Sequence, residues 1–356
     1  MVVSHSAPSS PCSSSARFST RVVLLDDRAR KLAEDSVSGK TRQRRFNNVV
    51  KFLDWAHAAG LTIPDVLPAS ENTLCNYAAS LTGQVAGTAK SKMASLKSWT
   101  VLEGHHWFGG ERLKKVLAGV GRATPPSSFR AKRHPVLPKH LRSLHDQLST
   151  QCGLDVCVAA AAKVMMYGQL CSGEVLPTNS DIHRYDSSSM PLARNLGPVN
   201  SSGSRCLFLP STKTTHQRGD EVLIPVQNGC TDPVRALQDH FAINNVCDTD
   251  PLFSYLDSAC IRRVLTVKVF LRRCNEIWKL YGYPVMSGHC FRIGGTTHYL
   301  RSGINPDVVK VFGHWKSAAF LTYWTHLESL GSLHLHRYMS QNSYFDSMQR
   351  RVSYSA

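Results

Sequence analysis

The chain has 356 residues, enough for two ordinary domains, and its 42 Lys and Arg residues against 25 Asp and Glu residues give a formal net charge of +17. Such a surplus indicates an anionic partner, either nucleic acid or an acidic membrane surface. The sequence contains no apolar run of about 18 residues that could span a bilayer, and its serine-rich start lacks the apolar core of a signal peptide. We therefore expect a soluble intracellular protein whose 11 scattered cysteines are free thiols.

The first part of the chain predicts a tail followed by a helical domain. Residues 1–27 are rich in serine and show little apolar periodicity, which predicts a disordered tail. Residues 28–124 carry apolar side chains at helical spacing, which predicts a small all-helical bundle. The expected helices contain Phe46–Leu53, ending near Gly60; Ser70–Leu81, with Ser70 as N-cap; Met93–Trp99; and Leu113–Val120.

This bundle carries most of the positive charge. Residues 28–133 contain 18 Lys and Arg residues and 7 Asp and Glu residues. The basic residues form two clusters. Each cluster could lie at a helix start that binds a phosphate, or it could be an ordinary solvated helix face. The clusters are Lys40, Arg42, Arg44 and Arg45, and Lys90, Lys92 and Lys97.

A linker and a second domain follow. Residues 125–138 contain four prolines together with Arg130, Lys132 and Arg133, which predicts a basic interdomain linker. Residues 139–330 are again mainly helical in pattern, except for two short β-type runs that begin at Arg205 and Glu221. These runs predict a hairpin with a long tip, and Lys213 comes just after its first strand. The predicted fold is therefore mainly α with a small β-hairpin.

The segment from Ser287 to Trp324 carries the most specific pattern. His289 and Arg292 are three residues apart, so a helix that begins near His289 would direct both at one phosphate. Gly303 would end this helix, and a short helix would follow over 305–311. His314 lies in a Gly-His-Trp sequence, and Tyr323 follows nine residues later.

The order His-x-x-Arg, Gly-His-Trp and Tyr resembles the catalytic region of the tyrosine recombinase and integrase family. The sequence GHWKSAAFLTYW within it is most similar to Crypton-type recombinases of fungal mobile elements. The resemblance covers roughly residues 28–330. It implies a helical core-binding domain over 28–124 and a catalytic domain over 139–330, which together clamp DNA. Lys213 is similar to the hairpin lysine of the family.

The family also has an arginine near the start of the catalytic domain, in a pattern such as Gly-Leu-Arg-x-x-Glu. The corresponding stretch here matches at Leu170 and Glu174, but Cys171 occupies the arginine position. A neutral thiol cannot replace a bidentate guanidinium donor. The resemblance therefore implies a recombinase whose chemistry is impaired at one residue.

The resemblance implies a role for each remaining group. Tyr323 would attack the phosphate and form a 3′-phosphotyrosine, and Arg292 would stabilise the charge that gathers on the phosphate oxygens. His289 and His314 would donate to those oxygens or take the tyrosine proton, and Lys213 would protonate the departing 5′ oxygen. Neither ATP nor a metal is needed, so no cofactor is expected.

Three functions stay open: a site-specific DNA recombinase, an inactive derivative that still binds DNA, and an enzyme similar to type IB topoisomerases. Tyr338 and Tyr344 are alternative nucleophiles if the spacing is coincidental. The expected partners are double-stranded DNA and, on two duplexes, four copies of the chain; the free chain could be monomeric. Residues 331–356 would be exchanged between protomers. The resemblance and the basic stretches favour the nucleus.

Overall fold

The structure, a computed structural model, describes residues 26–129, 132–212, 215, 218–315, 317, 320 and 321. The chain divides into two compact units, Met1–Ala131 and Lys132–Ala356, and each has its own buried apolar core. The division falls inside the proline-rich segment 125–138. Among the helices of these described ranges, none combines the length and apolar character that a bilayer crossing needs.

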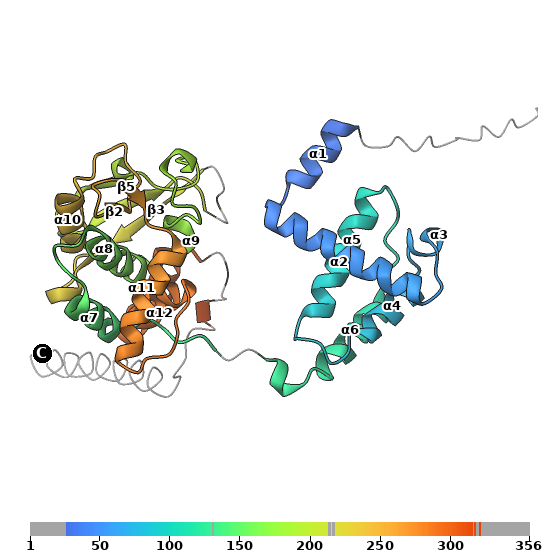
Figure 1. Cartoon of the computed structure of the whole chain (residues 1–356). Coiled ribbons are helices and arrows are strands. Elements are labelled where there is room, and N and C mark those ends of the chain that lie inside the picture. Colours follow the sequence, from blue (N-terminus) through green and yellow to red (C-terminus); the bar gives the residue numbers. More distant parts are fainter. Residues whose placement is uncertain are drawn as a thin grey trace, which may run out of the picture. The chain divides into compact units, whose positions relative to one another are not determined.

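The first unit is a helical bundle (Figure 1). The four helices predicted from apolar spacing are confirmed as α2, α4, α5 and α6, and the sequence pattern missed α1 and the single turn α3. The elements are α1 Asp27–Asp35, α2 Gly39–Ala58, α3 Ile63–Val66, α4 Glu71–Ser80, α5 Thr88–Leu102, α6 Glu111–Arg122 and the 3₁₀ turn η1 Pro126–Ser128.

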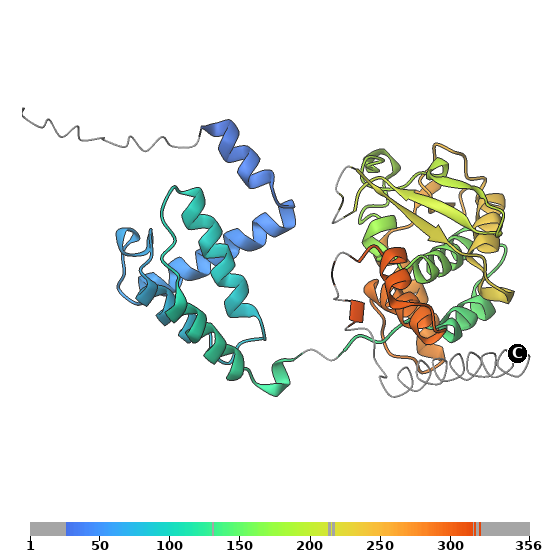
Figure 2. The same ribbon diagram turned by 180° about the vertical axis from the view of Figure 1, so that it is seen from behind.

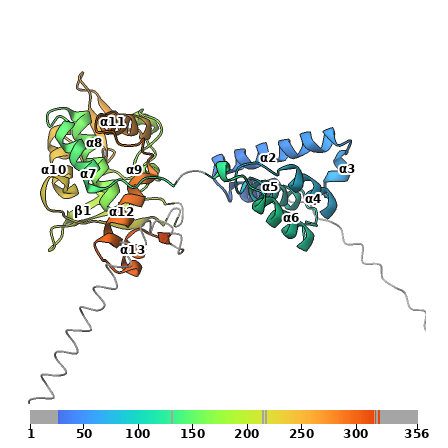
Figure 3. The same ribbon diagram turned by 90° about the horizontal axis from the view of Figure 1, so that it is seen from below.

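Serine caps and a small aromatic core hold this bundle together. The hydroxyl of Ser70 accepts a hydrogen bond from the backbone N–H of Thr73 at 3.1 Å, as expected of an N-cap at the start of α4. Helix α2 packs against α5, and α4 packs against α6 (Figure 3). Phe52 is fully buried in the core, whereas Phe46, which belongs to the same predicted apolar stripe, is 62% exposed. The stripe is therefore only partly a core face.

The second unit is mainly helical, with one three-stranded and one two-stranded antiparallel sheet (Figures 1 and 2). Its helices are α7 Pro138–Gln147, α8 Gly153–Tyr167, α9 Ser172–Val175, α10 Pro233–Asn244, α11 Val267–Leu280, α12 His289–Arg301 and α13 Pro306–Phe312. Its strands and 3₁₀ turns are β1 Leu196–Val199, β2 Arg205–Leu209, β3 Asp220–Ile224, β4 Ser254–Leu256, β5 Arg262–Val264, η2 Ile182–Arg184, η3 Ala193–Asn195 and η4 Gly229–Thr231.

Helix α8 is the centre of this unit. It is apolar on almost every side and nearly all of its residues are buried, as expected of a helix surrounded by other elements. It packs against α7, α10, α11 and α12. The predicted hairpin is confirmed: β2 pairs with β3 from Arg205 opposite Ile224 to Leu209 opposite Asp220. This architecture brings the start of α9, the start of α12 and the end of α13 toward one region.

Candidate functional site

The starts of α9 and α12 approach each other closely. A side chain at Gly288, the residue before α12, would collide with the side chain of Ser172, the first residue of α9. The predicted helix start at His289 is confirmed, so His289 and Arg292 share one face of the first turn. Cys171 is the N-cap of α9, and this approach places it beside that turn.

Arg292 is the most extensively held side chain of the cluster, with only 8% of its surface exposed. Its Nη1 donates to the carbonyl oxygen of Gln169 at 3.2 Å and to Oε2 of Glu174 at 3.4 Å. Its Nη2 donates to the carbonyl oxygen of Gly313. The guanidinium also stacks over the Trp315 ring, 4.2 Å from the ring centre. The guanidinium is therefore fixed by four groups from two stretches of the chain, residues 169–174 and 313–315.

Cys171 forms a pair with His289. The Sγ atom of Cys171 lies 3.1 Å from Nδ1 of His289, and the backbone N–H of Cys171 donates to Oε2 of Glu174 at 2.7 Å. Burial, helped by the charge of Glu174, raises the pKa of the Cys171 thiol to about 11. Burial also lowers the pKa of His289, and the positive charges of Arg133 and Arg292 lower it further. At neutral pH the pair is therefore a neutral thiol and a neutral imidazole.

His314 lies at the end of α13 in a left-handed backbone conformation, with φ of +52°. Its Nδ1 is 2.9 Å from Oδ2 of Asp220, the first residue of β3. Its Nε2 is buried and has no hydrogen-bond partner among the residues that the structure describes. A side chain at Gly313 would meet the Trp315 ring at 2.5 Å, so this turn requires glycine before the histidine.

Gln169 is a central residue of the cluster that the sequence pattern did not single out. It is fully buried and has φ of +51°, a conformation uncommon for residues other than glycine. Its Oε1 accepts from the Thr296 hydroxyl at 2.8 Å, and its backbone carbonyl accepts from Arg292. The only sequence signal was its position two residues before Cys171, inside the stretch compared with the family motif.

The cluster of the described residues therefore contains Cys171, Glu174, His289, Arg292 and His314. Two residues predicted for the chemistry, Lys213 and Tyr323, lie outside the described residues, as do the alternative nucleophiles Tyr338 and Tyr344 and the segment 331–356. The serine-rich tail lies outside them too, apart from its last two residues.

The basic residues predicted to bind DNA have different environments. Six of them are exposed: Lys40, Arg44, Lys90, Lys97, Lys132 and Arg133. Arg42 forms ion pairs with Asp35 at 2.9 Å and Glu34 at 3.7 Å, and Arg45 donates to the Ser98 hydroxyl at 2.9 Å. Arg130 lies outside the described residues.

Lys92 differs from the exposed basic residues. It is 9% exposed, and its amine lies 5.6 Å from the centre of the Tyr77 ring. Burial lowers its pKa. Arg44 and Lys92 line a hollow of about 600 Å³ at the start of α5. Exposed cations such as Arg44 are free to approach a phosphate backbone without losing a buried contact.

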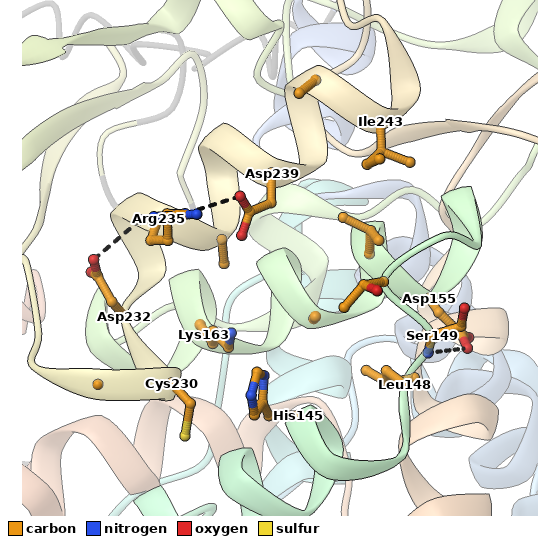
Figure 4. A pocket seen from close by; sticks show the side chains of 16 residues that line it. His145, Leu148, Ser149, Asp155, Lys163, Cys230, Asp232, Arg235, Asp239 and Ile243 are labelled. Carbon is orange, nitrogen blue, oxygen red and sulfur yellow. Dashed lines mark hydrogen bonds and ion pairs between the residues drawn. The ribbon is translucent and has the colours of Figure 1, made fainter.

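A separate cavity of about 510 Å³ lies between α7, α8 and α10 (Figure 4). Lys163, which is 7% exposed, lines it, and burial lowers the pKa of its amine. On α10, Arg235 pairs with Asp239 at 3.0 Å, as the figure shows. None of the residues predicted for catalysis lines this cavity, so it is distinct from the cluster around Arg292.

The fold was compared with known proteins. A variant of the Tn1549 transposon integrase in complex with a circular intermediate DNA has a TM-score of 0.53 and 14% identity, covering 86% of this chain and 98% of that chain. Another variant of the same integrase, in complex with transposon right end DNA, has a TM-score of 0.51 and 13% identity, covering 85% of this chain and 97% of that chain. A lambda integrase dimer bound to a COC′ core site gives 0.45 and 13%, covering 83% and 93%.

No family model and no curated protein matches the sequence. At identities this low, the structural likeness concerns the fold. The predicted fold class is confirmed: the chain has the mainly helical fold with small antiparallel sheets that tyrosine recombinases and integrases share.

Proposed function

We propose that this chain is a site-specific DNA recombinase of the tyrosine type whose catalysis is slowed by Cys171. The observation that carries the proposal is the cluster itself: Arg292, Glu174 and His289 lie in contact around Cys171, the position at which the family pattern has an arginine. The fold alone would not carry it, because one fold hosts many functions.

In the proposed reaction the Tyr323 oxygen forms a bond to the phosphorus of a DNA phosphodiester, and the bond from phosphorus to the 5′ oxygen breaks. The tyrosine proton passes to an imidazole, and Lys213 gives a proton to the departing oxygen. Arg292 stabilises the charge on the non-bridging oxygens, because its guanidinium is already fixed before DNA arrives. The phosphotyrosine conserves the energy of the broken phosphodiester bond. In the reverse reaction the 5′ hydroxyl of a second strand attacks the phosphorus, and the bond to the Tyr323 oxygen breaks.

Cys171 removes one cationic donor from this site. Loss of one such donor in comparable sites costs on the order of 10²- to 10³-fold in rate, about 3 to 4 kcal/mol. With its pKa raised to about 11, the thiol is uncharged at neutral pH and supplies no compensating interaction with a phosphate. The Cys171 environment therefore also favours a second candidate function, a derivative that binds DNA without cleaving it.

The family resemblance supports the finer parts of the proposal: a Crypton-type mobile element, action in the nucleus, and four protomers assembled on two duplexes. The DNA complexes of the Tn1549 integrase support double-stranded DNA as the partner. Light scattering with and without DNA tests the assembly. Supercoil relaxation without recombinant products would instead favour the topoisomerase-like activity.

The experiment that tests the proposal is covalent trapping on a nicked duplex that carries the sequence flanking the coding region. The unaltered chain, Cys171→Arg, and Cys171→Arg with Tyr323→Phe are compared. Cys206→Arg is the matched control, because it adds the same charge at an exposed cysteine of β2. We expect Cys171→Arg to form the adduct on the order of 10²- to 10³-fold faster than the unaltered chain, Cys206→Arg to match the unaltered chain, and Tyr323→Phe to abolish the adduct. DNA binding by every variant without any adduct would contradict the enzyme proposal and favour the binding derivative.

A further inference from the structure

The contact between His314 and Asp220 assigns a role to an aspartate outside the predicted catalytic set. We infer that Asp220 is a positioning residue: it holds the proton of His314 on Nδ1, so that Nε2 is left as the acceptor in the reaction. The inference rests on the proposed function and deepens it. The two atoms are 2.9 Å apart, and the side chains of His314 and Asp220 are 15% and 27% exposed.

The chemistry of the two groups fixes the direction of the hydrogen bond. An ionised carboxylate only accepts, so Nδ1 of His314 must carry the proton that joins it to Asp220. In the neutral ring the other nitrogen is then an acceptor. Nε2 is buried and has no partner among the described residues, so none of their donors competes for its lone pair. A carboxylate that orients an imidazole in this way is the usual support for a histidine base.

The backbone holds the His314 ring in place. His314 keeps a left-handed φ of +52°, and its N–H donates to the carbonyl oxygen of Val311 at 3.1 Å. The preceding carbonyl, that of Gly313, accepts from Arg292. Non-glycine residues hold this conformation only where the surroundings enforce it, and such positions cluster at functional sites. The ring and the guanidinium are therefore positioned by one shared turn.

The same contact joins the histidine to the base of the hairpin. Asp220 pairs with Leu209 at the end of the β2–β3 ladder, and residues 210–219 connect the two strands. Gly219 immediately before Asp220 has φ of +66°, and a side chain there would lie 2.5 Å from the Leu209 carbonyl oxygen. This required turn sets the position of Asp220. Lys213 belongs to the same connection, so one hairpin would carry the proposed acid and position the proposed base.

Other charged groups near the pair come from α13. Asp307 and Lys310 line a hollow of about 300 Å³ together with Asp220, His314 and Trp315. They supply one negative and one positive charge, whereas Asp220 is the acidic group in contact with the ring. We therefore attribute the tautomer of His314 to its contact with Asp220 rather than to Asp307 or Lys310.

Nitrogen-15 NMR of the full chain tests the inference without any need for activity. The ring signals of His314 are identified as those that His314→Gln removes. We expect the unaltered protein to carry the proton on Nδ1, and Asp220→Ala to shift it toward Nε2. Asp220→Asn should keep it on Nδ1, because an amide oxygen also accepts. Glu221→Ala is the matched control, since Glu221 follows on the same strand and is exposed. A proton on Nε2 in the unaltered protein, or an unchanged tautomer in Asp220→Ala, would overturn the inference.

Rates of adduct formation in the Cys171→Arg background give the second readout. We expect Asp220→Ala to lower the rate by about 10- to 100-fold, within the range of acid–base contributions, and Glu221→Ala to leave it unchanged. A shifted tautomer with an unchanged rate would contradict the positioning role. If the Cys171→Arg background forms no adduct, the proposed function fails, while the NMR result still decides what Asp220 does to His314.

Discussion

Arg292 supports the fold of the catalytic unit as well as its proposed chemistry, and this support can be measured. Replacement by alanine removes the donors to two backbone carbonyls and to Glu174, and the stacking on Trp315. Hydrogen bonds that involve a charged group contribute about 1.5 kcal/mol or more each, and the stacking about 1 kcal/mol. Because the side chain is buried, we expect Arg292→Ala to lower the free energy of unfolding by about 5 kcal/mol, at the upper end of the range for breaking a buried pair.

Urea unfolding followed by tryptophan fluorescence and circular dichroism measures this loss. Arg292→Lys keeps the charge but not the planar fork, so we expect a loss of about 2 kcal/mol. Arg301→Ala, an exposed residue on the same helix, is the control and should change stability by about 0.5 kcal/mol or less. A loss below about 1 kcal/mol for Arg292→Ala would refute the reasoning, since buried contacts of this kind cost more to remove.

Three further predictions concern acid stability, thiol reactivity and DNA binding. Burial lowers the pKa values of His140 and His240 to about 4, so the folded state prefers neutral rings; stability present above pH ~6.5 is lost as the pH falls toward 4. The free energy of unfolding measured in urea should be about 2 kcal/mol per ring lower at pH 5 than at pH 7. A difference that persists in the double variant His140→Gln, His240→Gln would contradict this. Alkylation of Cys171 by iodoacetamide at pH ~8 should be about 100-fold slower than that of a free cysteine, as peptide mass spectrometry can measure, and equal rates would refute the raised pKa. Arg44→Ala should weaken duplex binding and reduce the slope of log affinity against log salt concentration by about one, the value for one phosphate contact. An unchanged slope would show that Arg44 does not contact a phosphate.

Local patterns predicted much of the fold and part of the cluster. The spacing of His289 and Arg292 predicted that a helix beginning near His289 would carry both on one face, and α12 begins at that residue, because this relation depends only on helix geometry. The β2–β3 hairpin followed from two short β-type runs next to each other in the sequence. Both features rest on residues close together in the chain.

Contacts between distant segments could not be predicted in this way. Asp220, on β3, reaches His314 in the turn after α13, and Gln169 accepts from Arg292 across 123 positions of the chain. Gln169 and His314 also adopt left-handed backbone conformations that glycine usually marks, so their sequence gives no sign of the turn. Two partners of the guanidinium, the carbonyl oxygens of Gln169 and Gly313, belong to the backbone, so no residue type reveals them.

The most direct test of the central claim is to identify the residue that carries DNA in the Cys171→Arg adduct. After nuclease and protease digestion, mass spectrometry locates the peptide with the residual nucleotide. The account predicts one modified residue, Tyr323, linked through a 3′-phosphate. A nucleotide on Tyr338 or Tyr344, or on no tyrosine, would contradict the proposed nucleophile and the reaction built on it.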